Sequence, residues 1–286
     1  MSNSILWFSA AVMVSCLLLK RNSKIAEILG GTAWFLFGLY WVTLIPGFYE
    51  KADYINIILV LLLFSFCLLL ALFAARLFKD KMRRKDPVPS GAEALDRKIS
   101  AFFDLTKLAA VVCIIYMPFK LIISLSHALI ESVAFQTVYL LNMLGYDAAQ
   151  TAYDQIACGS IAVSVILACT AIESVAFFTG LVLTARDAGP KRKIFVFLVT
   201  VPVIYILNLI RNAFIVAAYS GLWFGSDSFE IAHHYIGKTG SGVVLLVLVY
   251  VTLKLLPKLT DMVSDLRDLV VDEMKRIFGI GTERME

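Results

Sequence analysis

The sequence predicts an all-α polytopic membrane protein with about seven transmembrane helices, and three observations support this fold class. Hydrophobic residues make up 60% of the 286 residues, and the mean hydropathy is +0.82. Both values are outside the usual range of soluble domains. Only 17% of the residues are charged, and these cluster between apolar stretches long enough to cross a bilayer. Positive charge also alternates between successive loops, as expected for a multi-pass protein.

The first half of the chain is expected to supply four spans and one interfacial helix. Residues 5–19 have no basic n-region and no small-residue cleavage site, so we assign them to a first span rather than to a signal peptide. The next three spans are predicted at residues 28–47, 55–78 and 105–125, the last containing Pro118 as a candidate kink. Residues 127–144 have mixed polarity with apolar residues at helical spacing, which suits a helix lying on the outer interface.

The second half begins with an ambiguous stretch. Residues 155–166 alternate β-branched residues around Gly159-Ser160, which favours a small β-hairpin followed by a fifth span from Cys169 to about residue 184. In the alternative, the fifth span begins near Ser160 and Cys169 lies deeper in it. Later apolar runs predict the sixth and seventh spans at residues 194–218 and 240–256, and an amphipathic helix at 259–280.

The distribution of Lys and Arg predicts the topology. The basic segments are residues 20–24, 79–98, 186–193 and the C-terminal tail, whereas residues 49–54, 126–157 and 219–235 are not basic. By the positive-inside rule, the N-terminus lies outside and the C-terminus in the cytoplasm. We therefore expect a transmembrane domain over residues 1–258, with its core motifs at 155–255, and a cytoplasmic amphipathic tail at 259–286.

This topology brings three chemically notable places to the outer face. Cys169 opens the fifth span, Arg211 lies in the outer part of the sixth, and the adjacent His233 and His234 follow it in an outer loop. Arg in the hydrocarbon region costs several kcal/mol or more, so it usually faces a cavity or a partner. The remaining cysteines lack zinc spacing, and Cys16, Cys67 and Cys113 lie within apolar runs where cysteine is usually inert.

These residue types suit acyl transfer. A thiol at a helix N-terminus is favoured as thiolate, which can form a covalent acyl intermediate. Arg211 can stabilise an oxyanion, and one of the two histidines, His233 or His234, can move protons. Glu173 follows Cys169 by one helical turn and is expected to pair with Arg211, while Asn208 shares the Arg211 segment as a supporting residue.

The segments 167–170, 208–212 and 233–238 together resemble the exosortase/archaeosortase family, most of all its archaeosortase branch. The resemblance implies a membrane cysteine transpeptidase from an archaeal source, with Cys169, Arg211 and His233 or His234 as its catalytic residues. It also implies substrates that are secreted surface proteins ending in a Pro-Gly-Phe tripeptide, a transmembrane helix and a basic tail. In that branch the tail is removed through a thioester and the protein is joined to a membrane lipid.

Two other functions remain as alternatives. A multi-pass transporter or channel could use Arg211 and Glu173 to bind an anionic solute, but the first, third and seventh spans are almost purely apolar. A lipid acyltransferase would use the same face without depending on the thiol. No metal or organic cofactor is expected, because no carboxylate–histidine cluster or phosphate-binding loop accompanies the site. A nucleic-acid partner is not indicated, since the net charge of +4 comes from short loops between apolar runs.

Overall fold

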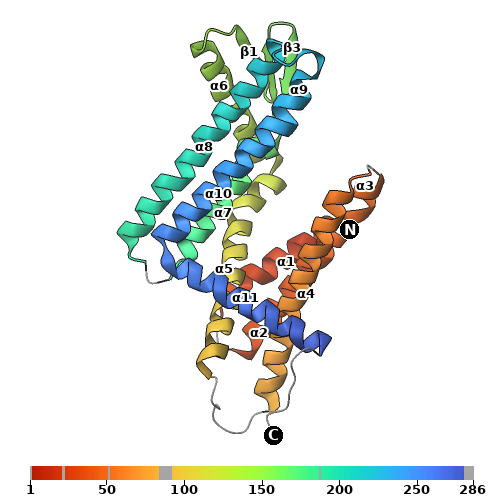
Figure 1. The fold of residues 1–286 in the computed structure, drawn as a ribbon, viewed down its shortest axis with the longest axis vertical. Coiled ribbons are helices and arrows are strands. Elements are labelled where there is room, and N and C mark those ends of the chain that lie inside the picture. Colours follow the sequence, from red (N-terminus) through yellow and green to blue (C-terminus); the bar gives the residue numbers. More distant parts are fainter. Residues whose placement is uncertain (1, 21–22, 51, 84–91, 187, 280–286) are drawn as a thin grey trace. The chain divides into compact units, whose positions relative to one another are not determined.

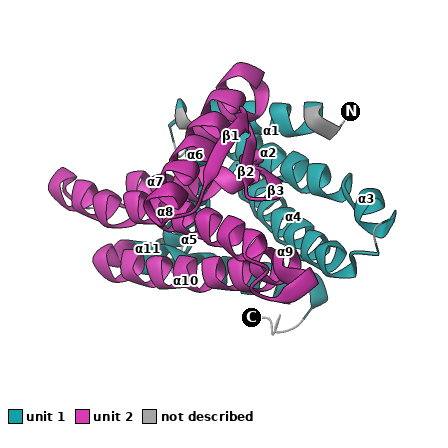
Figure 2. Ribbon diagram, turned by 90° about the horizontal axis from the view of Figure 1, so that it is seen from above, with its two compact units in different colours: residues 1–113, 259–286 teal, residues 114–258 magenta. Residues whose placement is uncertain are grey.

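A computed structural model describes residues 2–20, 23–50, 52–83, 92–186 and 188–279, and helices make up most of this part of the chain (Figure 1). The chain forms two compact units (Figure 2). Unit 1 contains residues 1–113 and 259–286, and unit 2 contains residues 114–258. Helix α5 (Ala92–Leu121) continues from the first unit into the second.

Unit 1 is a helical unit around a core of large apolar side chains. Its helices are α1 (Ser2–Leu17), α2 (Lys24–Val42), the short α3 (Ile45–Glu50), α4 (Tyr54–Arg83), the first part of α5, and α11 (Pro257–Phe278). Small residues let α2 and α4 approach closely, since a Cβ added at Gly31 would lie 2.9 Å from the Ala74 Cβ. Phe102 of α5 and Leu70 of α4 are fully buried in this core.

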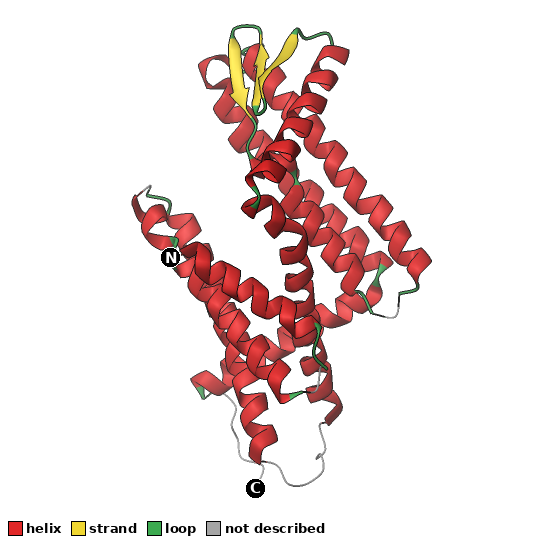
Figure 3. Cartoon of the chain, turned by 180° about the vertical axis from the view of Figure 1, so that it is seen from behind, coloured by secondary structure: helices red, strands yellow, loops and turns green. Residues whose placement is uncertain are grey.

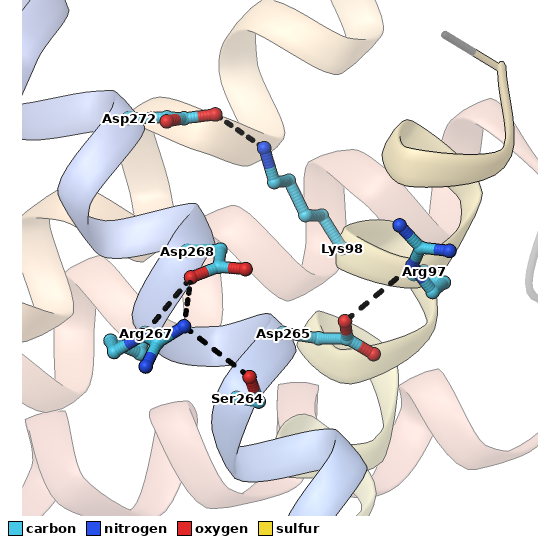
Figure 4. A network of polar contacts seen from close by, with 7 residues as sticks. All are labelled: Arg97, Lys98, Ser264, Asp265, Arg267, Asp268 and Asp272. Carbon is cyan, nitrogen blue, oxygen red and sulfur yellow. Dashed lines mark hydrogen bonds and ion pairs between the residues drawn. The ribbon is translucent and has the colours of Figure 1, made fainter.

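The C-terminal helix α11 is part of unit 1. Leu259 and Leu269 on its apolar face are almost completely buried. Ion pairs hold its polar flank, including Lys98 with Asp272, and Arg97 Nε with Asp265 Oδ1 at 3.7 Å (Figure 4). The amphipathic pattern at 259–280 therefore reflects packing against other helices of unit 1, in addition to any contact with a membrane surface. Residues 280–286 of the expected tail, and residues 84–91 of the most basic loop, lie outside the described residues.

Unit 2 carries a small sheet beside its helices. Helix α6 (Ile123–Met143) is followed by an antiparallel sheet of β1 (Ala148–Ala152), β2 (Gln155–Cys158) and β3 (Ile161–Ser164), in the order β1-β2-β3 (Figure 3). The predicted hairpin is confirmed, because β2 and β3 pair with Cys158 opposite Ile161 and Gly159 turns with φ +59°. Strand β1 was not predicted from the sequence. The Asn142 side chain holds the start of this strand, because it donates a hydrogen bond to the Ala148 carbonyl and accepts one from the Ala148 N–H.

The remaining elements of unit 2 are helical. The chain passes through a 3₁₀ helix, η1 (Leu167–Thr170), and then α7 (Ile172–Thr184) and the long α8 (Pro190–Ser220). The expected outer loop at 219–235 is also largely helical, with η2 (Gly225–Asp227), α9 (Ser228–Glu230) and the π-helix η3 (Ile231–Gly237). This π-helix continues directly into α10 (Lys238–Leu255).

The prediction of seven spans is not confirmed. Within the described residues, five helical segments are long and apolar enough to cross a membrane: Lys24–Glu50, Tyr54–Met82, Glu93–Leu121, Pro190–Ser220 and Gly225–Leu255. The other two expected spans correspond to the shorter apolar helices Ser4–Cys16 and Ile172–Thr184. The second of these has 13 residues and is about 20 Å long, less than the roughly 30 Å of a bilayer core.

Candidate active site

Cys169 lies in a tight turn between the sheet and α7. It belongs to η1, and Ala171, which follows the turn, has φ 61° in the left-handed region. This conformation costs a non-glycine residue on the order of 1 kcal/mol, and such strain is frequent at functional sites. The Thr170 hydroxyl donates to the Leu167 carbonyl at 2.7 Å and holds the turn closed. The thiol therefore precedes α7 by three residues, which corrects the expectation that Cys169 opens the helix.

Two amide side chains of α8 hold the backbone of Cys169. Asn208 Nδ2 donates to the Cys169 carbonyl oxygen at 2.8 Å, and Asn212 Nδ2 donates to the same oxygen at 3.0 Å. The two asparagines are four residues apart, so they share one face of the helix. Asn212 is only 7% exposed, and a buried amide that lost this acceptor would cost about 1–3 kcal/mol. The asparagines fix the turn against the segment of α8 that contains Arg211.

Arg211 lies between these asparagines on α8, close to the end of the π-helix. A Cβ added at Gly237 would be 3.1 Å from the Arg211 Nε and 2.9 Å from the Ala232 carbonyl oxygen. Only glycine allows the backbone to approach the guanidinium this closely. Among the described residues, the buried Arg211 Nε has no hydrogen-bond partner. Because a buried donor without an acceptor is costly, this Nε is a strong candidate for an interaction with a ligand.

The π-helix gives the two histidines different surroundings. His233 stacks on Phe229, with ring centroids 5.3 Å apart and an interplanar angle of 6°. Its Nδ1 is buried without a partner in the described part of the chain. His234 instead pairs with the exposed Glu230, with 3.7 Å between Nε2 and Oε2. π-Helical turns occur frequently at functional sites, where they change the direction of individual side chains.

A cavity of about 610 Å³ adjoins the Cys169 turn within unit 2. Its walls come from η1 and the start of α7, from α8, and from the junction of η3 with α10. Cys169 is half-buried. Its chain neighbours Ala168 and Ala171 line the cavity, whereas Cys169 itself is not among the lining residues. Arg211 and Asn208 also line the cavity, so it joins the thiol turn to the arginine.

The predicted pair between Glu173 and Arg211 is not formed in the described part of the chain, and two further residues belong to the site. Glu173 is exposed in the first turn of α7, and no ion pair or hydrogen bond joins it to Arg211 in the described residues. The prediction of this pair assumed that the carboxylate was buried. In the first turn of α7, the helix dipole stabilises the carboxylate without a cation. Sequence reasoning also missed Asn212 and Gly237, although the repeat of asparagine four residues after Asn208 was a usable signal.

With this geometry established, comparison with known proteins gives the class. Residues 2–250 match the family model of the transmembrane exosortase (Exosortase_EpsH), so the chain belongs to that family. It is a multi-pass membrane protein, and the family supports a membrane protein-sorting transpeptidase. Two relatives bear the name Archaeosortase A. The protein from Haloferax volcanii is 27% identical over 289 residues, covering 88% of each chain.

The second relative is from Natronomonas pharaonis. It is 24% identical over 284 residues, covering 88% of this chain and 82% of the relative. No solved structure matches the chain. The resemblance inferred from the three segments around Cys169, Arg211 and the histidines is thereby confirmed at the level of the family, and the transporter alternative is not favoured.

Proposed function

We propose that the chain is a membrane-embedded cysteine transpeptidase of the archaeosortase type. Its substrates are secreted proteins with a C-terminal sorting signal, consisting of a Pro-Gly-Phe-like tripeptide, a transmembrane helix and a basic tail. The acceptor is a membrane lipid. The observation that carries the proposal is the pair of hydrogen bonds from Asn208 and Asn212 to the Cys169 carbonyl, because they hold the thiol turn against Arg211.

The proposed reaction has two halves. The Cys169 thiolate attacks the carbonyl carbon at the cleavage site, and Arg211 stabilises the oxyanion that develops. His233 takes the thiol proton as the thiolate forms and returns it to the leaving amine as the C–N bond breaks, which leaves a thioester on Cys169. A hydroxyl or amine of the acceptor then attacks the thioester and gives its proton to His233, and the thiolate is released. Water in place of the acceptor would give hydrolysis only.

The burial and contacts of the histidines favour His233 over His234 for this role. His233 has a buried ring nitrogen that has no partner among the described residues, whereas His234 pairs with the exposed Glu230. The reaction is proposed for the outer face of the membrane. The N-terminus would lie outside and the C-terminus in the cytoplasm, because the basic segments then face inward.

The nucleophile assignment is tested with Cys169→Ala in cells that contain a protein with the expected sorting signal. We expect removal of the signal to fall below detection while the enzyme remains in the membrane fraction. Cys113→Ala is the matched control, since Cys113 is also partly exposed and is predicted to be inert. Normal processing by Cys169→Ala would refute the cysteine mechanism.

A further inference from the structure

The cavity beside the Cys169 turn has both of its charged lining residues at one end, next to the apolar Ile210, Phe214 and Ile236. On α8, its lining changes from Arg211 to Ile204, seven residues and about 10 Å deeper in the helix. On α10, it changes from Lys238 to Leu245 over the same rise. The two helices run in opposite directions and meet where Gly237 lies beside Arg211, so the charged residues of both walls are at the same end (Figure 1).

The charge at the polar end is uniformly positive. Arg211 and Lys238 are the charged members of the lining, and none of the lining residues is acidic. The buried Arg211 Nε is without an acceptor within the described residues. Lys238 is exposed, so its ammonium is available to a ligand. Two cations beside hydroxyl donors such as Ser174 and Ser241 suit a phosphate, whose oxygens accept several charge-assisted hydrogen bonds.

The cavity also has room for an elongated apolar group. A Cβ added at Gly240 or Gly242 on α10 would meet no atom within 4 Å, so both glycines border open space. The deeper walls are formed by Ile204, Leu207 and Leu245. A ligand that fits must therefore combine an anionic end with an apolar end.

Size and charge both distinguish a lipid from a sorting signal, whose transmembrane helix is followed by a basic tail rather than by an anionic group. A 20-residue transmembrane helix, about 30 Å long and 10 Å wide, occupies roughly 2,400 Å³. The cavity of about 610 Å³ is far smaller, and lies within the range of small-ligand pockets. It cannot enclose the helix of a sorting signal, but it can enclose a headgroup and the adjoining part of one lipid chain.

We propose that this cavity is the binding site of the lipid acceptor, and that the acceptor is an anionic phospholipid whose phosphate lies between Lys238 and Arg211. The inference rests on the proposed function, because it names the ligand of the second half of that reaction. The bound phosphate places the headgroup next to the Cys169 turn, where its terminal hydroxyl or amine can attack the thioester. The apolar chain lies along Ile204 and Leu245.

Lipid binding is measured with the full-length Cys169→Ala protein, which removes the chemistry. Purified protein in detergent is titrated with phosphatidic acid and with diacylglycerol of the same chains, and bound lipid is counted by native mass spectrometry. We expect one retained phosphatidic acid and much weaker retention of diacylglycerol. Lys238→Gln should lower the affinity for phosphatidic acid roughly tenfold, through loss of a charge-assisted contact.

A cavity-filling variant tests the location. Gly240→Leu projects a side chain into the open space and should lower lipid retention by at least roughly tenfold. Gly47→Leu is the matched control, because a Cβ at Gly47 also meets nothing within 4 Å but that residue does not line this cavity. Equal retention of diacylglycerol, displacement by millimolar inorganic phosphate, or full retention in Gly240→Leu would each overturn the proposal.

A second readout uses the active enzyme. Lys238→Gln should shift the products of signal removal from lipid-linked protein toward hydrolysed protein, because water replaces a weakly bound acceptor. An unchanged ratio of the two products would overturn the lipid site. That failure is distinct from failure of the proposed function, which would show itself as normal processing by Cys169→Ala.

Discussion

Two hydrogen bonds from α8 hold the carbonyl oxygen of Cys169, so they position the backbone and leave the thiol free to react. A hydrogen bond to the sulfur would instead compete with nucleophilic attack. The arrangement explains how a cysteine in a short irregular turn can be placed reproducibly. Asn208 and Asn212 are consequently positioning residues, and the catalytic roles are proposed for Cys169, Arg211 and His233.

The two histidines offer a comparison at the residue scale. His233→Ala should lower the rate of signal removal by roughly 10²–10⁴-fold, the usual contribution of general acid–base catalysis. His234→Ala should lower it by only a few-fold, because the partner of His234 is an exposed carboxylate. Rates are compared at equal amounts of enzyme in the membrane. A larger loss in His234→Ala would reassign the proton transfer to that residue.

At the scale of elements, the π-helix Ile231–Gly237 carries both histidines and packs against α8, and its last residue lies beside Arg211. In an uninterrupted α-helix through the same residues, the His233 side chain would point in another direction around the helix axis. The reason is that the rotation per residue differs between an α-helix and a π-helix. The glycine at the end of this element allows its backbone to lie beside the guanidinium.

Gly237→Ala tests that contact. The added Cβ would be 2.9 Å from the Ala232 carbonyl oxygen and 3.1 Å from the Arg211 Nε, so one of these groups must shift. We expect signal removal to fall by about tenfold or more, since displacement of a catalytic group by 1 Å can cost roughly 10²-fold. Gly47→Ala, where the added atom meets open space, should retain wild-type activity. Activity and thermal stability are measured together, and an unaltered rate in Gly237→Ala would contradict the close contact.

Helix α11 shows a buried charge of a different kind. Glu273 is 3% exposed and its Oε2 lies 2.9 Å from Arg76 Nη1. Burial nevertheless raises the pKa of Glu273, and Arg76 opposes that shift only in part. The folded protein therefore binds this proton more tightly than the unfolded chain does.

This shift predicts how stability depends on pH. The contribution of protonated Glu273 to the free energy of unfolding is fully present below the ordinary glutamate pKa of about 4.3. It is lost as the pH rises through the raised pKa of the folded protein. Thermal unfolding of detergent-solubilised protein should show a smaller fall in Tm above pH 4 for Glu273→Gln than for wild type. Asp268→Asn is the control, because its pair with Arg267 is exposed and contributes little. Identical profiles for Glu273→Gln and wild type would argue against the raised pKa.

At the scale of the whole molecule, two compact units share α5, and the candidate site lies entirely within the second. Unit 2 by itself supplies the thiol turn, the asparagine pair, the arginine, the histidines and the cavity. The candidate site therefore belongs to one unit, and the other unit has its own core and ion pairs in α2, α4, α5 and α11.

Membrane orientation is the prediction at this scale. Single cysteines at Asp147 and Asp227 should react with a membrane-impermeant thiol reagent in intact cells, whereas a cysteine at Ser90, which is outside the described residues, should react only after lysis. The expectation follows from the basic residues around position 90 and their scarcity near the other two. Labelling of the Ser90 position alone in intact cells would invert the topology and place the site on the cytoplasmic side.

The sequence by itself determined the membrane class, the family, the hairpin at 155–164 and the candidate residues Cys169, Arg211 and the histidine pair. Composition, charge pattern and costly polar groups in apolar surroundings are local properties that can be read without coordinates. Tertiary structure decided which histidine has a buried nitrogen without a partner in the described part of the chain, which residues hold the Cys169 carbonyl, and that Glu173 is exposed. These depend on a π-helical turn, a left-handed residue and the approach of α8 to η1, because such contacts join residues distant in sequence and leave no periodic signal.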